Sequence, residues 1–128
     1  MQNIVLDTNF LVTAYKFKLD IFEELKNVLD TKFQVYIVDK TINELEKLIK
    51  SGKLTDKVGA MVSIKYLKRK NIKIINTVQD NDVDELLLAL SPAQFIVATQ
   101  DKALKKRLKQ KKFKVLTIRQ RKQIVLEN

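Results

Sequence analysis

Near the start of the chain stands the run Ile4-Val5-Leu6-Asp7-Thr8-Asn9-Phe10, in which three aliphatic residues lead directly into an acid, a hydroxyl and an amide. A short apolar run is typical of a strand that is buried on both faces of a parallel sheet. In such sheets ligands bind beyond the carboxyl ends of the strands. The sequence therefore predicts that Asp7 lies at the carboxyl edge of the sheet, where ligands bind. The question for each of the other acids is whether the fold brings it to the same edge.

The composition limits the chemistry that is available at this edge. The 128 residues, of which 45% are hydrophobic, predict a single domain over residues 1–128 with one core. The chain contains no Cys and no His, which rules out thiolate and imidazole ligands, a Cys nucleophile and a Ser-His-Asp triad. Any metal must therefore be held by oxygen atoms, which favours Mg²⁺ or Mn²⁺ over Zn²⁺.

The formal net charge of +10 has two interpretations. It suits a polyanionic partner such as RNA, and it equally suits a Lys-rich surface that serves solubility or thermostability. The sequence contains no apolar run long enough to span a membrane, and its N-terminus lacks the pattern of a secretory signal. We therefore expect a soluble, cytoplasmic protein.

Strands and helices are predicted to alternate along the chain. Apolar and β-branched runs predict strands at about 4–6, 33–38, 71–77, 94–99 and 114–118. The helical spacing between them predicts a break near Leu19-Asp20 and a capping box with Thr41 as N-cap and Glu44 as its partner. A helix over residues 54–70 is predicted to use the following core contacts: Val58, Met61, Val62, Ile64 and Leu67. The tail over residues 119–128 is predicted to form either a short extra strand or a partner contact.

This alternation predicts an α/β fold with three layers, in which a five-stranded parallel sheet carries helices on both faces. The first, second and fourth strands are the most apolar and are expected at the centre. The third and fifth, which carry Lys73 and Lys114, are expected at the edges. The strand order 3-2-1-4-5 satisfies both expectations. Asp7 and Asp101, which end the first and fourth strands, then flank the point where the strand order reverses.

Each acid at this edge also has a purely structural interpretation. Asp7 and Asp101 both stand where they can cap the helices that follow them. Glu44 and Asp84, however, lie inside predicted helices, so their side chains can project toward the crevice. Clustered carboxylates repel one another unless a cation compensates their charge. The functional interpretation is a divalent metal site made of Asp7, Glu44, Asp84 and Asp101.

Four short motifs occur in a defined order: Val-Leu-Asp7-Thr-Asn, Ile-Asn-Glu44-Leu-Glu, Val-Asp84-Glu-Leu-Leu and Ala-Thr-Gln-Asp101-Lys. This set resembles the four acidic motifs of PIN domains, and its last motif is most similar to that of a small archaeal branch related to PIN nucleases that process ribosomal RNA. The resemblance covers nearly the whole chain. This sequence has Gln100 where the family often has Asn, Asp84-Glu85 as its paired acids, and no Pro before the helix of Glu44. Asp80 and Asp82 remain alternatives to Asp84 as the ligand.

The resemblance implies a metal-dependent endoribonuclease that hydrolyses RNA phosphodiester bonds with Mg²⁺ or Mn²⁺. We expect Asp7 and Asp101 to hold the principal ion, while Glu44 and Asp84 complete its shell or recruit a second ion. Three polar neighbours are expected to orient carboxylates or waters: Thr8, Asn9 and Thr99. Asn9 would bond a carboxylate and a water together, and Thr99 has the alternative of bonding only backbone.

The partners follow from the same hypothesis. The basic residues after the fourth acid are expected to flank bound RNA, or else to form a solvated helix face: Lys102, Lys105, Lys106 and Arg107. The biological role would be that of a toxin with an antitoxin protein as partner, or that of a nuclease that processes ribosomal RNA. A homodimer is compatible with either role.

Three other classes compete with the nuclease. A catalytically silent PIN-like module that binds RNA or protein would gain nothing from uncompensated acids. A receiver domain needs an Asp at the end of the third strand, where this chain has Asn76-Thr77. A phosphatase of the haloacid-dehalogenase type needs a second Asp two residues after Asp7, where this chain has Asn9.

Overall fold

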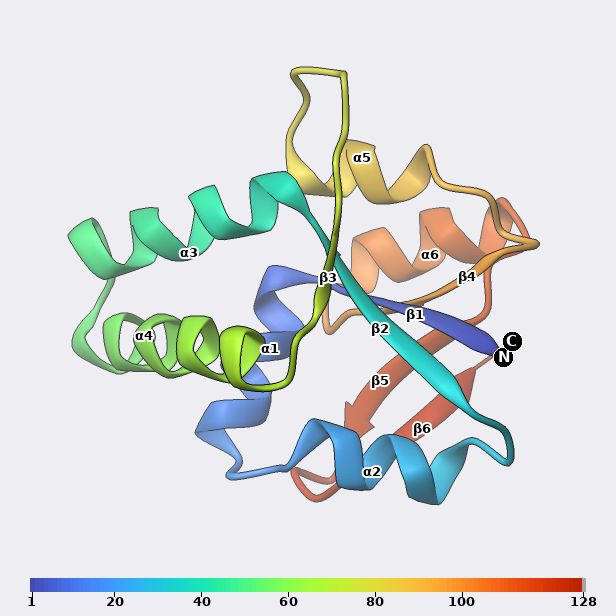
Figure 1. Cartoon of the computed structure of the whole chain (residues 1–128), viewed down its shortest axis with the longest axis horizontal. Coiled ribbons are helices and arrows are strands. Elements are labelled where there is room, and N and C mark those ends of the chain that lie inside the picture. Colours follow the sequence, from blue (N-terminus) through green and yellow to red (C-terminus); the bar gives the residue numbers. More distant parts are fainter. Residues whose placement is uncertain (128) are drawn as a thin grey trace.

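A six-stranded sheet forms the centre of the molecule in a computed structural model, which describes residues 1–127 (Figure 1). The strands are β1 (Gln2–Leu6), β2 (Phe33–Val38), β3 (Lys73–Ile75), β4 (Phe95–Ala98), β5 (Val115–Arg119) and β6 (Gln123–Glu127). The helices are α1 (Thr8–Lys16), α2 (Ile21–Val28), α3 (Asp39–Ser51), α4 (Leu54–Arg69), α5 (Val83–Leu88) and α6 (Lys102–Gln110).

The strand order is β3-β2-β1-β4-β5-β6, which confirms the predicted order 3-2-1-4-5 and extends it by one strand. The first five strands are parallel, whereas β6 runs antiparallel to β5. The prediction of a five-stranded parallel sheet was therefore one strand short. The prediction that the fifth strand is an edge was wrong, because the tail folds back over it and residues 115–118 are buried. Asn128, the end of the predicted tail, lies outside the described residues.

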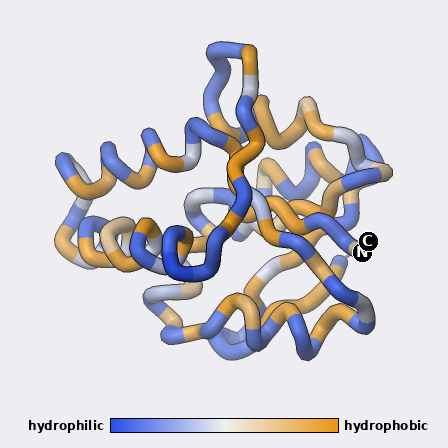
Figure 2. Tube along the Cα trace, in the orientation of Figure 1, coloured by the Kyte–Doolittle hydropathy of each residue, from blue (hydrophilic) through white to orange (hydrophobic). Residues whose placement is uncertain are grey.

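Side chains of β1 alternate between the two faces of the sheet, as the pleat requires. Ile4 and Leu6 pack into a core with α1, α2, α3 and α4, and Val5 packs into a second core with α5 and α6. All three residues are completely buried. The sheet therefore lies between two helical layers, which confirms the predicted three-layer α/β architecture (Figure 1). In Figure 2 the helices alternate between hydrophilic and hydrophobic positions, as expected for helices with one buried face.

The pairing of β1 with β4 brings together segments that are far apart in the sequence. Leu6 is the register partner of Ala98, so Asp7 and Thr99 both follow directly at the carboxyl end of the sheet. The Asp7 amide donates a hydrogen bond of 2.9 Å to the Ala98 carbonyl. The candidate site therefore depends on a contact between residues more than ninety positions apart.

Helix starts were predicted with mixed success. Asp20 caps α2 by accepting a hydrogen bond from the Glu23 amide, so the predicted break is confirmed. The predicted capping box of Thr41 and Glu44 was wrong, because α3 begins earlier, at Asp39. Thr41 is buried in the first turn and its hydroxyl has no hydrogen-bond partner among the described residues. Glu44 is consequently free of a capping role.

The inner face of α4 was predicted correctly only at Leu67, which is buried, and at Ile64, which packs against the core. Val58, Met61 and Val62 are exposed, with Met61 at 47%. The face that packs on α1 is instead made of small residues, including Gly59 and Ala60. A Cβ atom at Gly59 would lie 3.1 Å from the Val12 side chain, so the two helices approach closely there. None of the helices within residues 1–127 has the length and apolar character needed to cross a lipid bilayer.

Candidate active site

Asp7 ends the central strand and is held by two hydrogen bonds. Its Oδ1 accepts from the Thr8 amide at 2.8 Å, and its Oδ2 accepts from the Thr99 hydroxyl at 2.6 Å. Asp7 is only 3% exposed, and Thr99 is completely buried. The side chain is thus fixed in position, with one hydrogen bond from its own helix and one from the neighbouring strand.

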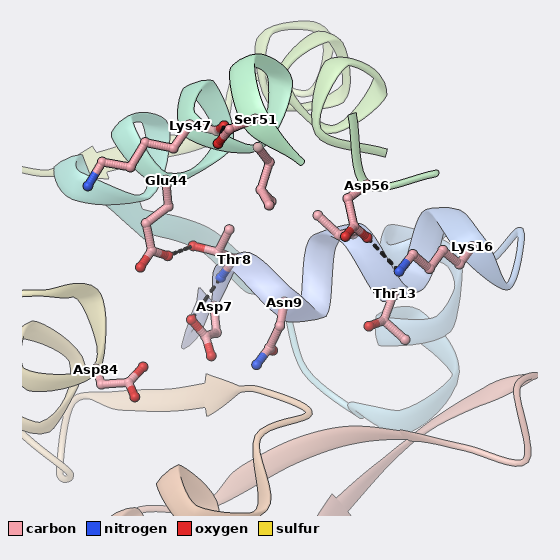
Figure 3. A pocket seen from close by; sticks show the side chains of 12 residues that line it. Asp7, Thr8, Asn9, Thr13, Lys16, Glu44, Lys47, Ser51, Asp56 and Asp84 are labelled. Carbon is pink, nitrogen blue, oxygen red and sulfur yellow. Dashed lines mark hydrogen bonds and ion pairs between the residues drawn. The ribbon is translucent and has the colours of Figure 1, made fainter. Parts of the chain in front are cut away.

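Glu44 reaches the same place from α3. The Thr8 hydroxyl donates a hydrogen bond to Glu44 Oε1, so a single residue at the start of α1 bonds Asp7 through its backbone and Glu44 through its side chain (Figure 3). This geometry explains why a Thr follows Asp7: its hydroxyl sets the position of the second carboxylate. Thr8 thus contacts two of the four acids, as its predicted orienting role would require.

Thr99 connects Asp7 to the fourth acid. Its hydroxyl donates to Asp7 and accepts from the Asp101 amide at 3.2 Å. Asp101 itself caps α6 by accepting from the Leu104 amide at 3.0 Å. A continuous series of hydrogen bonds therefore runs from Glu44 through Thr8, Asp7 and Thr99 to the backbone of Asp101.

Asn9 has a different partner from the one predicted. Its Oδ1 accepts from the Gln100 amide at 3.1 Å, so it fixes the turn that precedes Asp101 rather than binding a carboxylate. Gln100 bonds both the amide and the carbonyl of Ile118, which ties this turn to β5. These two amide side chains hold the ends of β1, β4 and β5 in register.

Asp84 faces the other three acids from α5, across the carboxyl end of the sheet. It lines the same cavity as Asp7 and Glu44 (Figure 3). The two alternative acids of this turn are engaged elsewhere: Asp82 caps α5, and Asp80 pairs with Lys40 at 2.9 Å. The geometry supports Asp84 as the member of the acidic turn that faces the cavity. Asp101 is absent from the lining of that cavity in the described structure, and its charge acts on Asp84.

Within residues 1–127, none of the four acids at this site is paired with a basic side chain, and Arg107 lowers the pKa of Asp84 only against larger raising effects. Burial, together with the negative charges of Asp84 and Glu44, raises the pKa of Asp7 to about 6, against the lowering effect of the Thr99 hydrogen bond. Burial, followed by the charges of Asp101, Asp82 and Glu44, also raises the pKa of Asp84. Within residues 1–127 no salt bridge involves Asp7, Glu44, Asp84 or Asp101. A buried carboxylate next to like charges is stabilised when a cation binds.

The donor set fits a hard divalent cation. Every candidate ligand is a carboxylate oxygen, as Mg²⁺ and Mn²⁺ prefer. In the described part of the chain, no three acidic side chains are arranged to ligate one ion by themselves. Mg²⁺ commonly keeps several water ligands and uses only one or two carboxylates. The arrangement therefore suits an ion that is held partly through water.

The basic residues after Asp101 divide into two groups. Lys102 and Lys106 are exposed on α6. Lys105 donates to the Thr117 hydroxyl and lies 3.7 Å from Glu127, whereas Arg107 pairs with Glu85 at 3.1 Å. Arg107 is also exposed, but its charge is shared with Glu85, whereas Lys102 and Lys106 form no ion pair within residues 1–127.

Several residues of the cavity were not anticipated from the sequence. The cavity, of about 510 Å³, extends from the acids past Thr13 to Lys16 and Asp56, with Lys47 on its α3 side. The spacing of Asn9, Val12, Thr13 and Lys16 places them on one face of α1. This spacing could have identified these residues as cavity-lining from the sequence. A search for apolar positions alone does not find them, because most of the four are polar.

Comparisons with known proteins agree with this geometry. The model of a family described as PIN like domain matches residues 4–121. Ribonuclease VapC4 of Methanocaldococcus jannaschii is 38% identical over 124 residues, covering 95% of this chain and 94% of that protein. Ribonuclease VapC9 of Archaeoglobus fulgidus is 30% identical over 123 residues, covering 96% of this chain and 87% of that protein. A solved structure of the PIN domain endonuclease Utp24 matches with a TM-score of 0.82 and 25% identity, covering 98% of this chain and 90% of that one.

Proposed function

This chain belongs to the PIN-like domain family, and we propose that it is a metal-dependent endoribonuclease whose active site is built from Asp7, Glu44, Asp84 and Asp101. The ribonuclease names of two relatives and the endonuclease name of the structural neighbour support this activity. The observation that carries the proposal for the site is the buried Asp7, whose pKa is raised by burial and by two neighbouring acids while no basic side chain compensates it. Such a site is costly unless it binds a cation.

Asp7, Glu44 and Asp84 would hold the ion at the cavity, directly or through water, and Asp101 would complete the site from the side of Asp84. Mg²⁺ and Mn²⁺ suit these ligands. Bound there, a divalent ion supplies charge neutralisation at the scissile phosphate and activation of the attacking water. Divalent metals are used generally by PIN nucleases, which agrees with the oxygen-only donor set of this chain.

The remaining residues act by fixing positions. Thr8 and Thr99 restrain the carboxylates of Glu44 and Asp7, so that their oxygen atoms need little reorganisation when the ion and the substrate bind. Asn9 and Gln100 hold the turn that carries Asp101. These hydrogen bonds set the geometry of the site before any ligand arrives.

Binding of RNA is supported by the charge of the chain. A protein with a net charge of +10 attracts a polyanion, and the exposed Lys102 and Lys106 on α6 flank the turn of Asp101. Contacts of this kind give affinity for the phosphate backbone without reading its sequence. Lys105 and Arg107, which are engaged in ion pairs, contribute through the overall positive potential.

Two roles agree with the family: a toxin that is inhibited by an antitoxin protein, and a nuclease that processes ribosomal RNA. A small inhibitory protein encoded in the adjacent reading frame, which abolishes cleavage by binding at the acids, would establish the toxin role. Cleavage of one defined site in precursor ribosomal RNA would establish the processing role. Sedimentation of the purified protein would show whether it forms a homodimer.

The activity is tested with purified protein and single-stranded RNA. We expect cleavage with Mn²⁺ or Mg²⁺ and none in EDTA. The Asp7→Asn variant should lose about 100-fold or more of its rate and remain folded. Asp30→Asn is the matched control, since Asp30 is exposed in the turn between α2 and β2. Cleavage that survives both chelation and Asp7→Asn would overturn the proposal, and a titration without divalent binding would favour a silent module.

A further inference from the structure

The cavity at the acids continues as a groove between α1 and α3 (Figure 3). The α1 side presents residues three or four apart, and so does the α3 side, as expected for two helix faces that oppose each other. The groove is lined from α1 by Thr8, Asn9, Val12, Thr13 and Lys16, and from α3 by Glu44, Lys47, Leu48 and Ser51. Its volume of about 510 Å³ is within the range of small-molecule sites.

The two ends of this α1–α3 groove differ in chemistry. One end holds the acids Asp7 and Glu44. At the other end Lys16 and Asp56 form an ion pair of 2.7 Å, with side chains that are 39% and 30% exposed. From Thr8 to Lys16 the helix rises about 12 Å. Between the ends the lining is apolar and consists of the half-buried Leu48 and the small exposed part of Val12.

We propose that this groove binds the ribonucleotide next to the scissile phosphate, with its base against Val12 and Leu48 and the edge of the base at the Lys16–Asp56 pair. The inference rests on the proposed nuclease function and specifies where that activity would discriminate among RNA sequences. Single-stranded RNA is recognised through unstacked bases whose edges form hydrogen bonds. The Lys16 ammonium donates and the Asp56 carboxylate accepts, so the pair offers both kinds of partner to a base.

A purely structural role does not account for the position of the pair. The helices α1 and α4 already pack closely at Gly59, where a Cβ atom would lie 3.1 Å from the Val12 side chain. A partly exposed ion pair adds little to stability. Its place at the end of a groove that starts at the acids, and its exposure to that groove, indicate a function in binding.

The experiment compares cut-site preference in a pool of randomised single-stranded RNA. The test variants are Asp56→Asn and Lys16→Met, which remove one charge each and keep the size of the side chain. The matched controls are Glu23→Gln and Lys26→Met, which break an exposed ion pair of 3.3 Å on α2. Sequencing the product ends gives the nucleotide frequencies on both sides of the cut.

We expect the groove variants to change the frequencies at one position next to the cut by about tenfold, whereas both controls keep the wild-type pattern. Melting curves check that each variant is folded. A cut-site pattern that is the same in the groove variants, the controls and the wild type would overturn the inference while leaving the nuclease proposal intact.

Photo-crosslinking separates this inference from the nuclease proposal. Wild-type protein in EDTA is irradiated with RNA that contains 4-thiouridine, and the modified peptides are identified by mass spectrometry. Crosslinks to the groove faces over residues 8–16 and 44–56 support the inference even when the protein cleaves no RNA. Crosslinks confined to other surfaces, or no RNA binding at all, overturn it.

Discussion

Asp7 and Glu127 are both acids at strand ends, yet the fold surrounds them with opposite charges. Glu127, at the end of β6, lies 2.9 Å from Lys109, 3.4 Å from Arg119 and 3.7 Å from Lys105. The hydrogen bond from Lys109 and the charges of the three basic residues hold its pKa below the usual range, against the effect of burial. Asp7 has two acids as neighbours, and its pKa rises to about 6.

The difference is informative because basic residues are abundant in this chain. With 25 Lys and Arg against 15 Asp and Glu, the sequence has enough cations to pair every acid. Three of them converge on Glu127, and in the described structure none forms an ion pair with Asp7. Glu127 is thus a structural acid, and the missing countercharge at Asp7 is the feature that a bound cation would supply.

The largest expected effect concerns activity. Asp84→Asn should lower RNA cleavage by about 100-fold or more, because it removes a proposed ligand from the cavity. Asp80→Asn should leave the rate within about twofold, because Asp80 is exposed and pairs with Lys40 outside the cavity. Initial rates with labelled RNA measure both. Equal losses in the two variants would contradict the assignment of Asp84.

The second prediction concerns the contribution of Glu127 to stability. Glu127→Gln should lower the free energy of unfolding by about 2 kcal/mol, because three basic side chains lose their shared partner under α6. Urea denaturation measures the change. Glu46→Gln, at an exposed position of α3, is the control and should change stability by less than about 0.5 kcal/mol. If both variants unfold at the same urea concentration, the cluster at Glu127 is not stabilising.

Removing the charge of Asp7 should stabilise the protein, whereas removing the charge of Glu127 should destabilise it. In EDTA at pH 7.5, Asp7→Asn is expected to raise the free energy of unfolding by about 1 kcal/mol, since repulsion is relieved while one of two accepted hydrogen bonds is lost. The melting temperature should increase by several degrees. A lower melting temperature for Asp7→Asn would show that the lost hydrogen bond outweighs the repulsion.

The raised pKa of Asp7 also predicts how the stability of the protein depends on pH. The pKa of Asp7 rises from 3.8 to about 6 on folding, so the folded state binds a proton more tightly than the unfolded state. The contribution of Asp7 to stability is therefore fully present below about pH 4 and is lost as the pH rises through about 6. Melting curves from pH 4 to 7 in EDTA should show this fall as a difference between wild type and Asp7→Asn. Parallel curves for the two proteins would contradict it.

The smallest effect is the response to metal. An Mn²⁺ concentration about three times the dissociation constant should stabilise the wild type by about 0.8 kcal/mol. The same shift is expected in Glu127→Gln and none in Asp7→Asn. Thermal melting with and without Mn²⁺ measures all three. Stabilisation of Asp7→Asn by Mn²⁺ would place the binding site elsewhere on the molecule.

The core of the fold was predictable because a strand that is buried on both faces of the sheet consists of a continuous run of apolar residues. Continuous apolar runs marked β1, β2 and β4 as central, and the alternation of elements then gave the strand order and brought Asp7 beside Thr99 and Asp101. The spacing of Glu44 and Asp84 inside helices indicated that they are free to face the cavity. These predictions depended on patterns that are local to each element.

The predictions that failed either lacked a local signal in the sequence or depended on contacts that are distant in it. The turn before β6 places Gln120 and Arg121 at positive φ without the usual Gly or Asn, so the hairpin lacked its turn signal. The start of α3 at Asp39 accompanies hydrogen bonds from Thr77 to the Asp39 carboxylate. The packing face of α4 uses small residues such as Gly59, which hydrophobic periodicity ignores.

The pairing of β1 with β4 has a consequence for synthesis of the protein. Asp7 emerges from the ribosome early, but its partner Thr99 follows 92 residues later. Until that strand is made, Asp7 has neither its second hydrogen bond nor the neighbouring carboxylate of Asp101. A nascent chain shorter than this therefore cannot assemble the proposed catalytic centre.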